Sequence, residues 1–177
     1  LPGTDEQMRE PYRSLNPQMR VPALQTEQGL LTQSLAILVW LDQMYPEPRL
    51  TPADPWLGAQ VRAFALTIAT DIHPLNNTST LNYLKGPLQQ DQAAVDAWYR
   101  YWVENGFSAL ETMLRPGPYA FGSRVTIADL CLVPQVFNAR RFKADLSAFP
   151  KIAAVEAACL KLPAFDKARP ENQPDAE

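Results

Sequence analysis

The chain has 177 residues, of which 46% are hydrophobic and 20% are charged, and its formal net charge is −3. This composition is that of an ordinary globular protein with one or two domains. The slightly acidic balance argues against a nucleic acid as partner, and no apolar run approaches the length of a membrane span.

The cysteines and the start of the sequence bear on the cellular compartment. Cys131 and Cys159 lie far apart and lack the spacing of metal ligands, so we expect neither a disulfide framework nor a metal site. No signal peptide opens the sequence, and unpaired cysteines fit a reducing environment. We therefore expect a cytoplasmic protein.

Residues 1–45 predict a small α/β unit. Its first part, residues 4–15, is polar and interrupted by Pro11, which predicts a short irregular helix. The following segments predict, in order, a strand at 21–26, a turn at 27–29, a strand at 30–32, and a helix from Ser34 to Tyr45 with Thr32 or Ser34 as its N-cap.

Two dipeptides in this unit suggest a binding site. Pro22 enters a strand, where a proline sits at a first position, and an X-Pro bond adopts the cis form at low cost. If Val21-Pro22 is cis, the backbone N–H and C=O of Val21 turn outward and can pair with an extended peptide. Gln33-Ser34 places a hydroxyl and free N–H groups at a helix start, where a carboxylate binds well. Together they predict a seat for a small acidic peptide, although each alone is more often a plain turn or a plain helix cap.

The segment from Pro46 to Pro55 holds four prolines in ten residues and cannot continue a helix. It predicts a linker at 46–55 between a first domain at 1–45 and a second domain at 56–177. The pattern beyond the linker is helical throughout, with no strand-like alternation. We expect helices at 56–84 with a bend near His73-Pro74, 91–114, 126–142, 150–162 and 164–168.

One local motif in the second domain is specific. Thr126 stands three residues before Asp129 and just ahead of an apolar run, which predicts a capping box at a helix start. Such a box serves folding rather than chemistry. Cys131, inside the apolar run, is interpreted as a small core residue.

Several motifs together resemble the zeta class of the cytosolic glutathione transferases. They are Val21-Pro22-Ala23-Leu24, Gln33-Ser34-Leu35-Ala36-Ile37, Asp71-Ile72-His73-Pro74-Leu75-Asn76-Asn77, the stretch from Ala128 to Val136, Arg141-Phe142-Lys143-Ala144-Asp145-Leu146, and Gln173-Pro174-Asp175. The resemblance implies a partial thioredoxin-like α/β domain followed by an all-helical C-terminal domain. It also implies a homodimer.

The activity implied by the resemblance is glutathione-dependent cis–trans isomerisation. Maleylacetoacetate would be converted to fumarylacetoacetate, a step of tyrosine and phenylalanine catabolism, by reversible addition of the thiolate to the double bond. Three alternatives stay open: isomerisation of maleylpyruvate, a transferase or dehalogenase activity on haloacids or chlorinated hydroquinones, and a non-catalytic interaction protein on the same scaffold.

The resemblance also assigns residues to glutathione, the implied cofactor. In the first domain they are Val21, Pro22, Gln33, Ser34 and Gln7, and in the second His73, Asn77, Thr78 and Ser79. His73 is the only histidine, and we favour a hydrogen-bonding role for it over proton transfer. The thiol-activating serine or cysteine of the family is expected upstream of Leu1, so no catalytic residue is assigned.

A basic cluster of Arg140, Arg141 and Lys143 stands at a predicted helix end. Such charges often only compensate the helix dipole. A small dicarboxylate substrate, however, needs local positive charge on an acidic protein, and a guanidinium pairs bidentately with a carboxylate. The family likeness of Arg141-Phe142 favours Arg141 as the residue that binds a substrate carboxylate.

Overall fold

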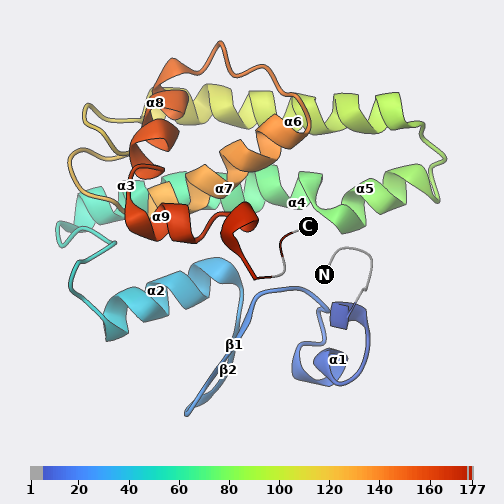
Figure 1. Cartoon of the computed structure of the whole chain (residues 1–177), viewed down its shortest axis with the longest axis horizontal. Helices are drawn as coiled ribbons and strands as arrows, with labels where there is room; N and C mark the ends of the chain where they lie inside the picture. Colours follow the sequence, from blue (N-terminus) through green and yellow to red (C-terminus); the bar gives the residue numbers. More distant parts are fainter. Residues whose placement is uncertain (1–5, 175, 177) are drawn as a thin grey trace. The chain divides into compact units, whose positions relative to one another are not determined.

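The computed structural model describes residues 6–174 and 176. The chain begins with short elements and one hairpin and continues as helices (Figure 1). The first elements are the 3₁₀ turn η1 (Glu6–Met8), α1 (Tyr12–Leu15), β1 (Ala23–Thr26), β2 (Gly29–Thr32) and α2 (Ser34–Met44). Pro11 separates η1 from α1, as the sequence predicts, while residues 4 and 5 lie outside the described part.

Strands β1 and β2 form an antiparallel hairpin in which Ala23 pairs with Thr32 and Thr26 with Gly29. The connection is two residues long, one fewer than predicted, because Gly29 takes a φ of +131° and already belongs to β2. The Thr26 hydroxyl tightens this turn by donating to the Gly29 carbonyl at 2.8 Å. The opposite, open end of the hairpin therefore brings the residues before 23 beside those after 32.

The start of α2 differs from the prediction. Neither Thr32 nor Ser34 caps the helix; the N-cap is Gln33, whose φ is +70° and whose side chain makes no capping hydrogen bond. The short connection explains this difference. Because β2 ends at Thr32 and α2 begins at Ser34, only Gln33 remains to turn the chain from strand to helix. The first N–H groups of α2 are thus met by no capping side chain.

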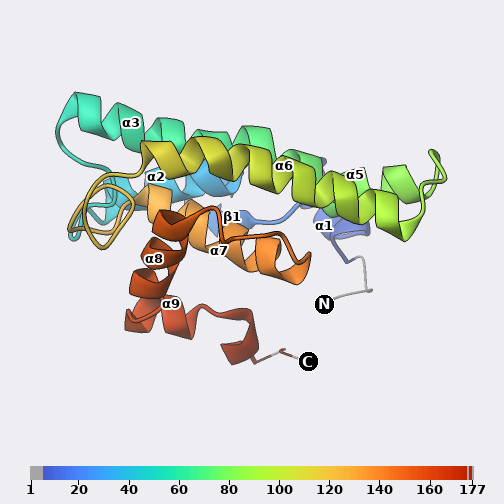
Figure 2. The same ribbon diagram turned by 90° about the horizontal axis from the view of Figure 1, so that it is seen from above.

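The later part of the chain is helical. Its elements are α3 (Pro55–Leu66), the π-helical η2 (Thr67–Ile72), α4 (His73–Asn76), α5 (Thr78–Lys85), α6 (Gln92–Met113), α7 (Ile127–Arg141), α8 (Pro150–Cys159), α9 (Pro163–Lys167) and the 3₁₀ turn η3 (Pro170–Asn172). In Figure 2, α6 runs alongside the line of η2, α4 and α5, while α7 packs against α3 and α8. Between residues 55 and 174 the described backbone contains no strand, only an isolated bridge between Tyr119 and Gly122.

The predicted helix at 56–84 is bent, but it is also interrupted twice. A six-residue π-helical segment, Thr67–Ile72, precedes His73, and the extended backbone of Asn77 (ψ 148°) separates α4 from α5. Pro74 has no N–H to donate to the preceding turn, which disfavours regular α-helix there. The hydroxyls of Thr67 and Thr70 donate to carbonyls four residues back, at 3.0 and 2.9 Å, a pattern that bends helices.

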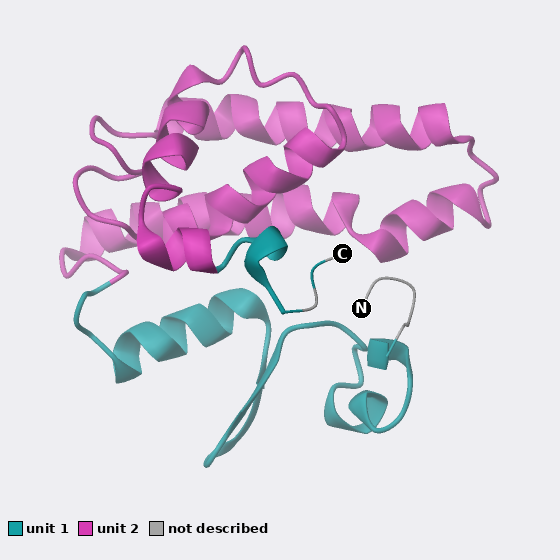
Figure 3. Cartoon of the chain, in the orientation of Figure 1, with its two compact units in different colours: residues 1–49, 168–177 teal, residues 50–167 magenta. Residues whose placement is uncertain are grey.

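The contacts divide the chain into two compact units (Figure 3). Unit 1 comprises residues 1–49 and 168–177, and unit 2 comprises residues 50–167. The domain limits read from the sequence, 1–45, 46–55 and 56–177, stay predictions. The units differ from them in that residues 168–177 group with the first part and residue 50 already groups with the helices.

The core of unit 2 lies among α3, η2, α6, α7 and α8. Its largest fully buried apolar side chains are Phe64, Phe107, Ile72, Leu110, Ile127, Leu132, Ile152, Val61, Val95, Val103 and Val136. At the crossing of α6 and η2, Gly106 lies against Ile72 so closely that a Cβ at position 106 would overlap the Ile72 side chain. No described helix combines the length and the apolar character needed to cross a membrane.

The predicted capping box at the start of α7 is confirmed. One oxygen of Asp129 accepts from the Thr126 N–H at 2.7 Å and from the Thr126 hydroxyl at 3.0 Å. The other oxygen accepts from the Ala120 N–H at 2.7 Å, and the Cys159 thiol approaches it at 3.9 Å. Burial raises the pKa of this fully buried carboxyl, and the hydrogen bonds oppose that rise.

Candidate functional site

In unit 1, Val21-Pro22 and Gln33-Ser34 flank the open end of the hairpin. The Val21-Pro22 peptide bond is cis, as predicted. The Val21 side chain is 73% exposed, and sheet pairing begins only at Ala23. The backbone N–H and C=O of Val21 make no hydrogen bond to residues 6–174 or 176. This edge is therefore open to an extended peptide.

The turn that leads to Val21 holds Gln33 in place. The Gln33 side-chain amide donates to the Gln18 carboxamide oxygen at 2.9 Å. Gln18 is fixed by Asn16, which is 3% exposed, accepts from the Gln18 N–H at 3.1 Å and donates to the Arg20 carbonyl at 2.7 Å. Sequence reasoning missed both Gln18 and Asn16, although the Asn16-Pro17 dipeptide is a turn signal.

Gln7 is placed differently from the other predicted residues of unit 1. It lies in η1, is half-buried, and makes no side-chain hydrogen bond within the described part of the chain. The hairpin register brings Val21, Pro22, Gln33 and Ser34 together, whereas no contact of this kind joins Gln7 to them.

In unit 2 the predicted residues His73, Asn77, Thr78 and Ser79 cluster around the break between α4 and α5. His73 is exposed and opens α4. Asn77 is the N-cap of α5, and its Oδ1 accepts from the N–H and the hydroxyl of Ser79, both at 3.1 Å. The Asn77 Oδ1 therefore caps the start of α5. The N–H groups of the same side-chain amide take no part in these capping hydrogen bonds.

The basic cluster at the end of α7 separates into two parts. Arg140 binds Glu156 of α8 through two hydrogen bonds, Nε to Oε1 at 3.2 Å and a terminal nitrogen to Oε2 at 2.5 Å. This pairing raises the pKa of Arg140. Arg141 is exposed, and its side chain makes no hydrogen bond or ion pair with a described residue. Of the two adjacent arginines, only Arg140 has an anionic partner among the described residues.

The backbone beyond Arg141 is closely determined. Lys143 takes a left-handed φ of +56°, its N–H donates to the Arg140 carbonyl at 3.0 Å, and the Ala144 N–H donates to the Ala139 carbonyl at 3.0 Å. These two bonds form a Schellman motif, which usually uses glycine where Lys143 stands. The last residue of α7 is therefore held by a complete cap.

Both cysteines are free thiols. Cys159 is buried, whereas Cys131 is only half-buried, so its interpretation as a core residue was too strong. Burial raises the pKa of Cys131 to about 11 and that of Cys159 to about 12, the latter with help from the Asp129 charge. Neither thiol is prepared to act as a nucleophile, and the described residues include no cluster of metal-binding side chains.

Two family models match the sequence. The description "Glutathione S-transferase, N-terminal domain" matches residues 1–49, and "Glutathione S-transferase, C-terminal domain" matches residues 92–170. A maleylpyruvate isomerase from Ralstonia sp. is 46% identical over 98% of this chain and 84% of its own length. The zeta-class resemblance stated from the sequence is confirmed.

Solved structures agree with this assignment and with the predicted fold class. The holo structure of a maleyl pyruvate isomerase, described as a bacterial glutathione S-transferase of the zeta class, superimposes with a TM-score of 0.96 at 46% identity, covering 99% of this chain and 84% of that one. A maleylacetoacetate isomerase from Anaeromyxobacter dehalogenans, with bound dicarboxyethyl glutathione and citrate, gives 0.84 at 40% identity over 89% and 73%.

We expect both thiols to react slowly in the folded protein. With a pKa of about 11, Cys131 is thiolate in only about one molecule in a thousand at pH 8, and Cys159 in fewer. Titration with a chromogenic disulfide reagent should show slow labelling in buffer and rapid labelling of two thiols in denaturant. Rapid labelling of the native protein at pH 8 would contradict the assignment of inert cysteines.

Proposed function

The chain belongs to the glutathione S-transferase family, and we propose that it is a glutathione-dependent cis–trans isomerase acting on maleylacetoacetate, with maleylpyruvate as the second candidate. Relatives named for each of these activities support the proposal. The structural observation that carries it is the open edge at Val21 beside the uncapped start of α2, which together suit a short peptide with a terminal carboxylate.

The residues of unit 1 fit glutathione. The family uses this tripeptide, and relatives have been solved with it bound. We propose that Val21 pairs through its backbone with the cysteinyl residue, while the N–H groups at the start of α2 and the Ser34 hydroxyl hold the γ-glutamyl carboxylate. One N–H of the Gln33 side-chain amide donates to Gln18, and the Oε1 of the same amide is placed to accept from the γ-glutamyl ammonium group. When bound, glutathione supplies the thiolate that makes the isomerisation possible.

The remaining assignments are also proposals. Gln7 would hold the glycyl end. In unit 2, His73 and the Asn77 amide offer hydrogen bonds, and Thr78 and Ser79 add exposed hydroxyls at the start of α5. We keep His73 as a hydrogen-bonding group rather than a proton carrier.

We propose that Arg141 binds a substrate carboxylate. Its neighbour Arg140 is neutralised by Glu156, whereas Arg141 is exposed and has no anionic partner among the described residues. A guanidinium pairs with a carboxylate through two parallel hydrogen bonds, which orients the substrate as well as binding it. Bound citrate and dicarboxyethyl glutathione in the Anaeromyxobacter relative support a carboxylate-rich ligand for this family.

Turnover of the two maleyl compounds tests the activity. We expect isomerisation of maleylacetoacetate, measured by absorbance, that requires glutathione and is not replaced by an equal concentration of a simple thiol. A preference for maleylpyruvate would select the second candidate. Release of chloride from a haloacid, with neither maleyl compound converted, would sink the isomerase proposal.

Two substitutions should separate the two ligands. Arg141→Ala removes one charge-assisted pair, so kcat/KM for the dicarboxylate should fall roughly ten- to a hundredfold, through KM, with glutathione affinity nearly unchanged. Ser34→Ala should weaken glutathione binding first. Steady-state kinetics with each ligand varied in turn measures both effects.

Arg140→Ala is the matched control for Arg141→Ala. It breaks the pair with the nearly buried Glu156, so it should lower the thermal midpoint and leave KM for the dicarboxylate intact. If Arg141→Ala instead lowers stability and leaves the kinetics unchanged, Arg141 is a helix-end charge and the proposed role is wrong.

We further propose that the protein is a homodimer. One face of α3 supports this, because Trp56 is 72% exposed and Leu66 is 44% exposed, with the exposed Ala59 and Ala63 between them at helical spacing. Sedimentation at micromolar concentration should show a dimer, and Trp56→Glu should shift it towards the monomer. A monomer before substitution would refute the proposal.

A further inference from the structure

Arg141 is a long side chain at the last position of a helix, where backbones commonly fray. Two parallel hydrogen bonds to a carboxylate require a well-defined direction of the guanidinium, so the backbone that carries the arginine must be held in place. The contacts that fix the end of α7 begin with the neighbouring residue Phe142.

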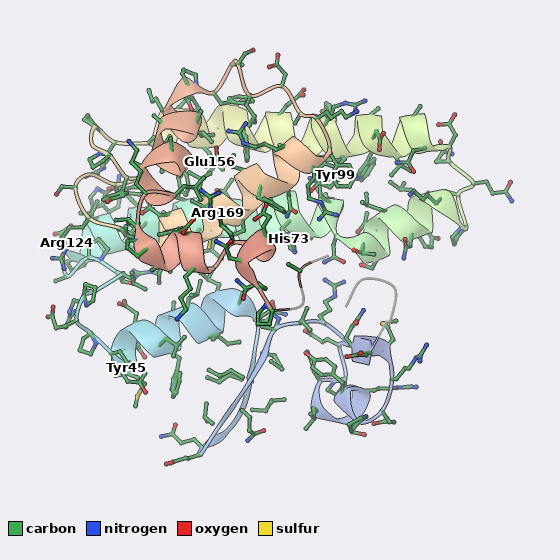
Figure 4. The ribbon with its side chains drawn as sticks, in the orientation of Figure 1. Tyr45, His73, Tyr99, Arg124, Glu156 and Arg169 are labelled. Atoms are coloured by element: carbon green, nitrogen blue, oxygen red, sulfur yellow. The ribbon has the colours of Figure 1, made fainter. Side chains whose placement is uncertain are left out.

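The ring of Phe142 lies flat on the ring of Tyr99, with centroids 3.6 Å apart and planes inclined by 7°. Tyr99 belongs to the middle of α6 and is only 2% exposed, so it is a rigid platform rather than a surface residue. Figure 4 shows Tyr99 between α6 and the end of α7. The residue directly after Arg141 is therefore anchored to a different helix.

Backbone contacts act in the same direction. The Schellman motif at Lys143 turns the chain away directly after Phe142. Beyond it, the Asp145 N–H reaches Glu104 of α6 at 3.4 Å. Arg141 thus stands between a regular helix on one side and a segment attached to α6 on the other.

The platform also leaves the charge of Arg141 intact. Arg141 lies near enough to Tyr99 for its charge to favour the phenolate, yet burial dominates and raises the pKa of Tyr99 to about 12. The phenol is accordingly neutral at physiological pH. A carboxylate in the place of the Tyr99 phenol would neutralise Arg141, as Glu156 neutralises Arg140.

We propose that Phe142, stacked on Tyr99, is a positioning residue that sets the direction of Arg141 toward the substrate carboxylate. The inference rests on the proposed role of Arg141 and adds a residue that touches no ligand. If it is correct, loss of the stack weakens dicarboxylate binding and leaves glutathione binding unchanged.

The test compares Phe142→Leu with Phe142→Tyr in the full protein. Phe142→Leu keeps apolar volume but removes the stack, so KM for the dicarboxylate should rise about tenfold while kcat and the KM for glutathione stay nearly constant. Phe142→Tyr retains the ring and should restore the wild-type KM. Phe142→Met is the second variant without a ring and carries the same expectation if Phe142→Leu does not fold.

A double-mutant cycle separates this inference from the proposal beneath it. With Arg141→Ala already present, Phe142→Leu should add nothing to KM. A rise that persists in the Arg141→Ala background, or one that affects glutathione equally, would overturn the positioning role. If Arg141→Ala raises KM and Phe142→Leu does not, only the positioning inference fails. If Arg141→Ala itself has no effect, the role of Arg141 fails first.

Discussion

The buried carboxylate of Asp129 is the contact on which the order of unit 2 most depends. It receives hydrogen bonds from the cap residue of α7 and from Ala120 in the preceding loop, and it faces the thiol of α8. These contacts fix the first turn of α7, a helix of fifteen residues that contains Pro134 in its interior. Because an interior proline can bend a helix, the direction of the last turn also depends on contacts at that end, such as the stack of Phe142 on Tyr99. The exposed Arg141 is consequently placed by contacts at both ends of the same helix, the buried Asp129 at its start and Phe142 just past its end.

Features determined by neighbouring residues were predictable from the sequence. The Thr126–Asp129 box, the cis bond before Pro22 and the hairpin all arise from chemistry within a few positions, so their signals are local. The position of Gln33 as N-cap of α2 was not predictable. Its positive φ results from a strand that ends, and a helix that begins, on either side of this single residue. Local propensity alone does not specify such a junction.

The difference between Arg140 and Arg141 was hidden from the sequence for another reason. Both are basic residues at one helix end, and only the packing of α8 supplies Glu156 to the first of them. The same holds for Gln18, which becomes relevant only when the hairpin returns the chain to Gln33. In each case the hydrogen-bonding state of a side chain depends on a partner that lies 15 or 16 residues away in the sequence.

The close contact between Gly106 and Ile72 has a consequence for how this sequence can diverge. Any side chain at position 106 would occupy the volume that the isoleucine fills where α6 crosses the π-helical segment. Packed interiors tolerate volume exchange better than volume gain. The two positions should therefore co-vary as a pair among descendants of this chain, with a larger residue on α6 admitted only when a smaller one faces it.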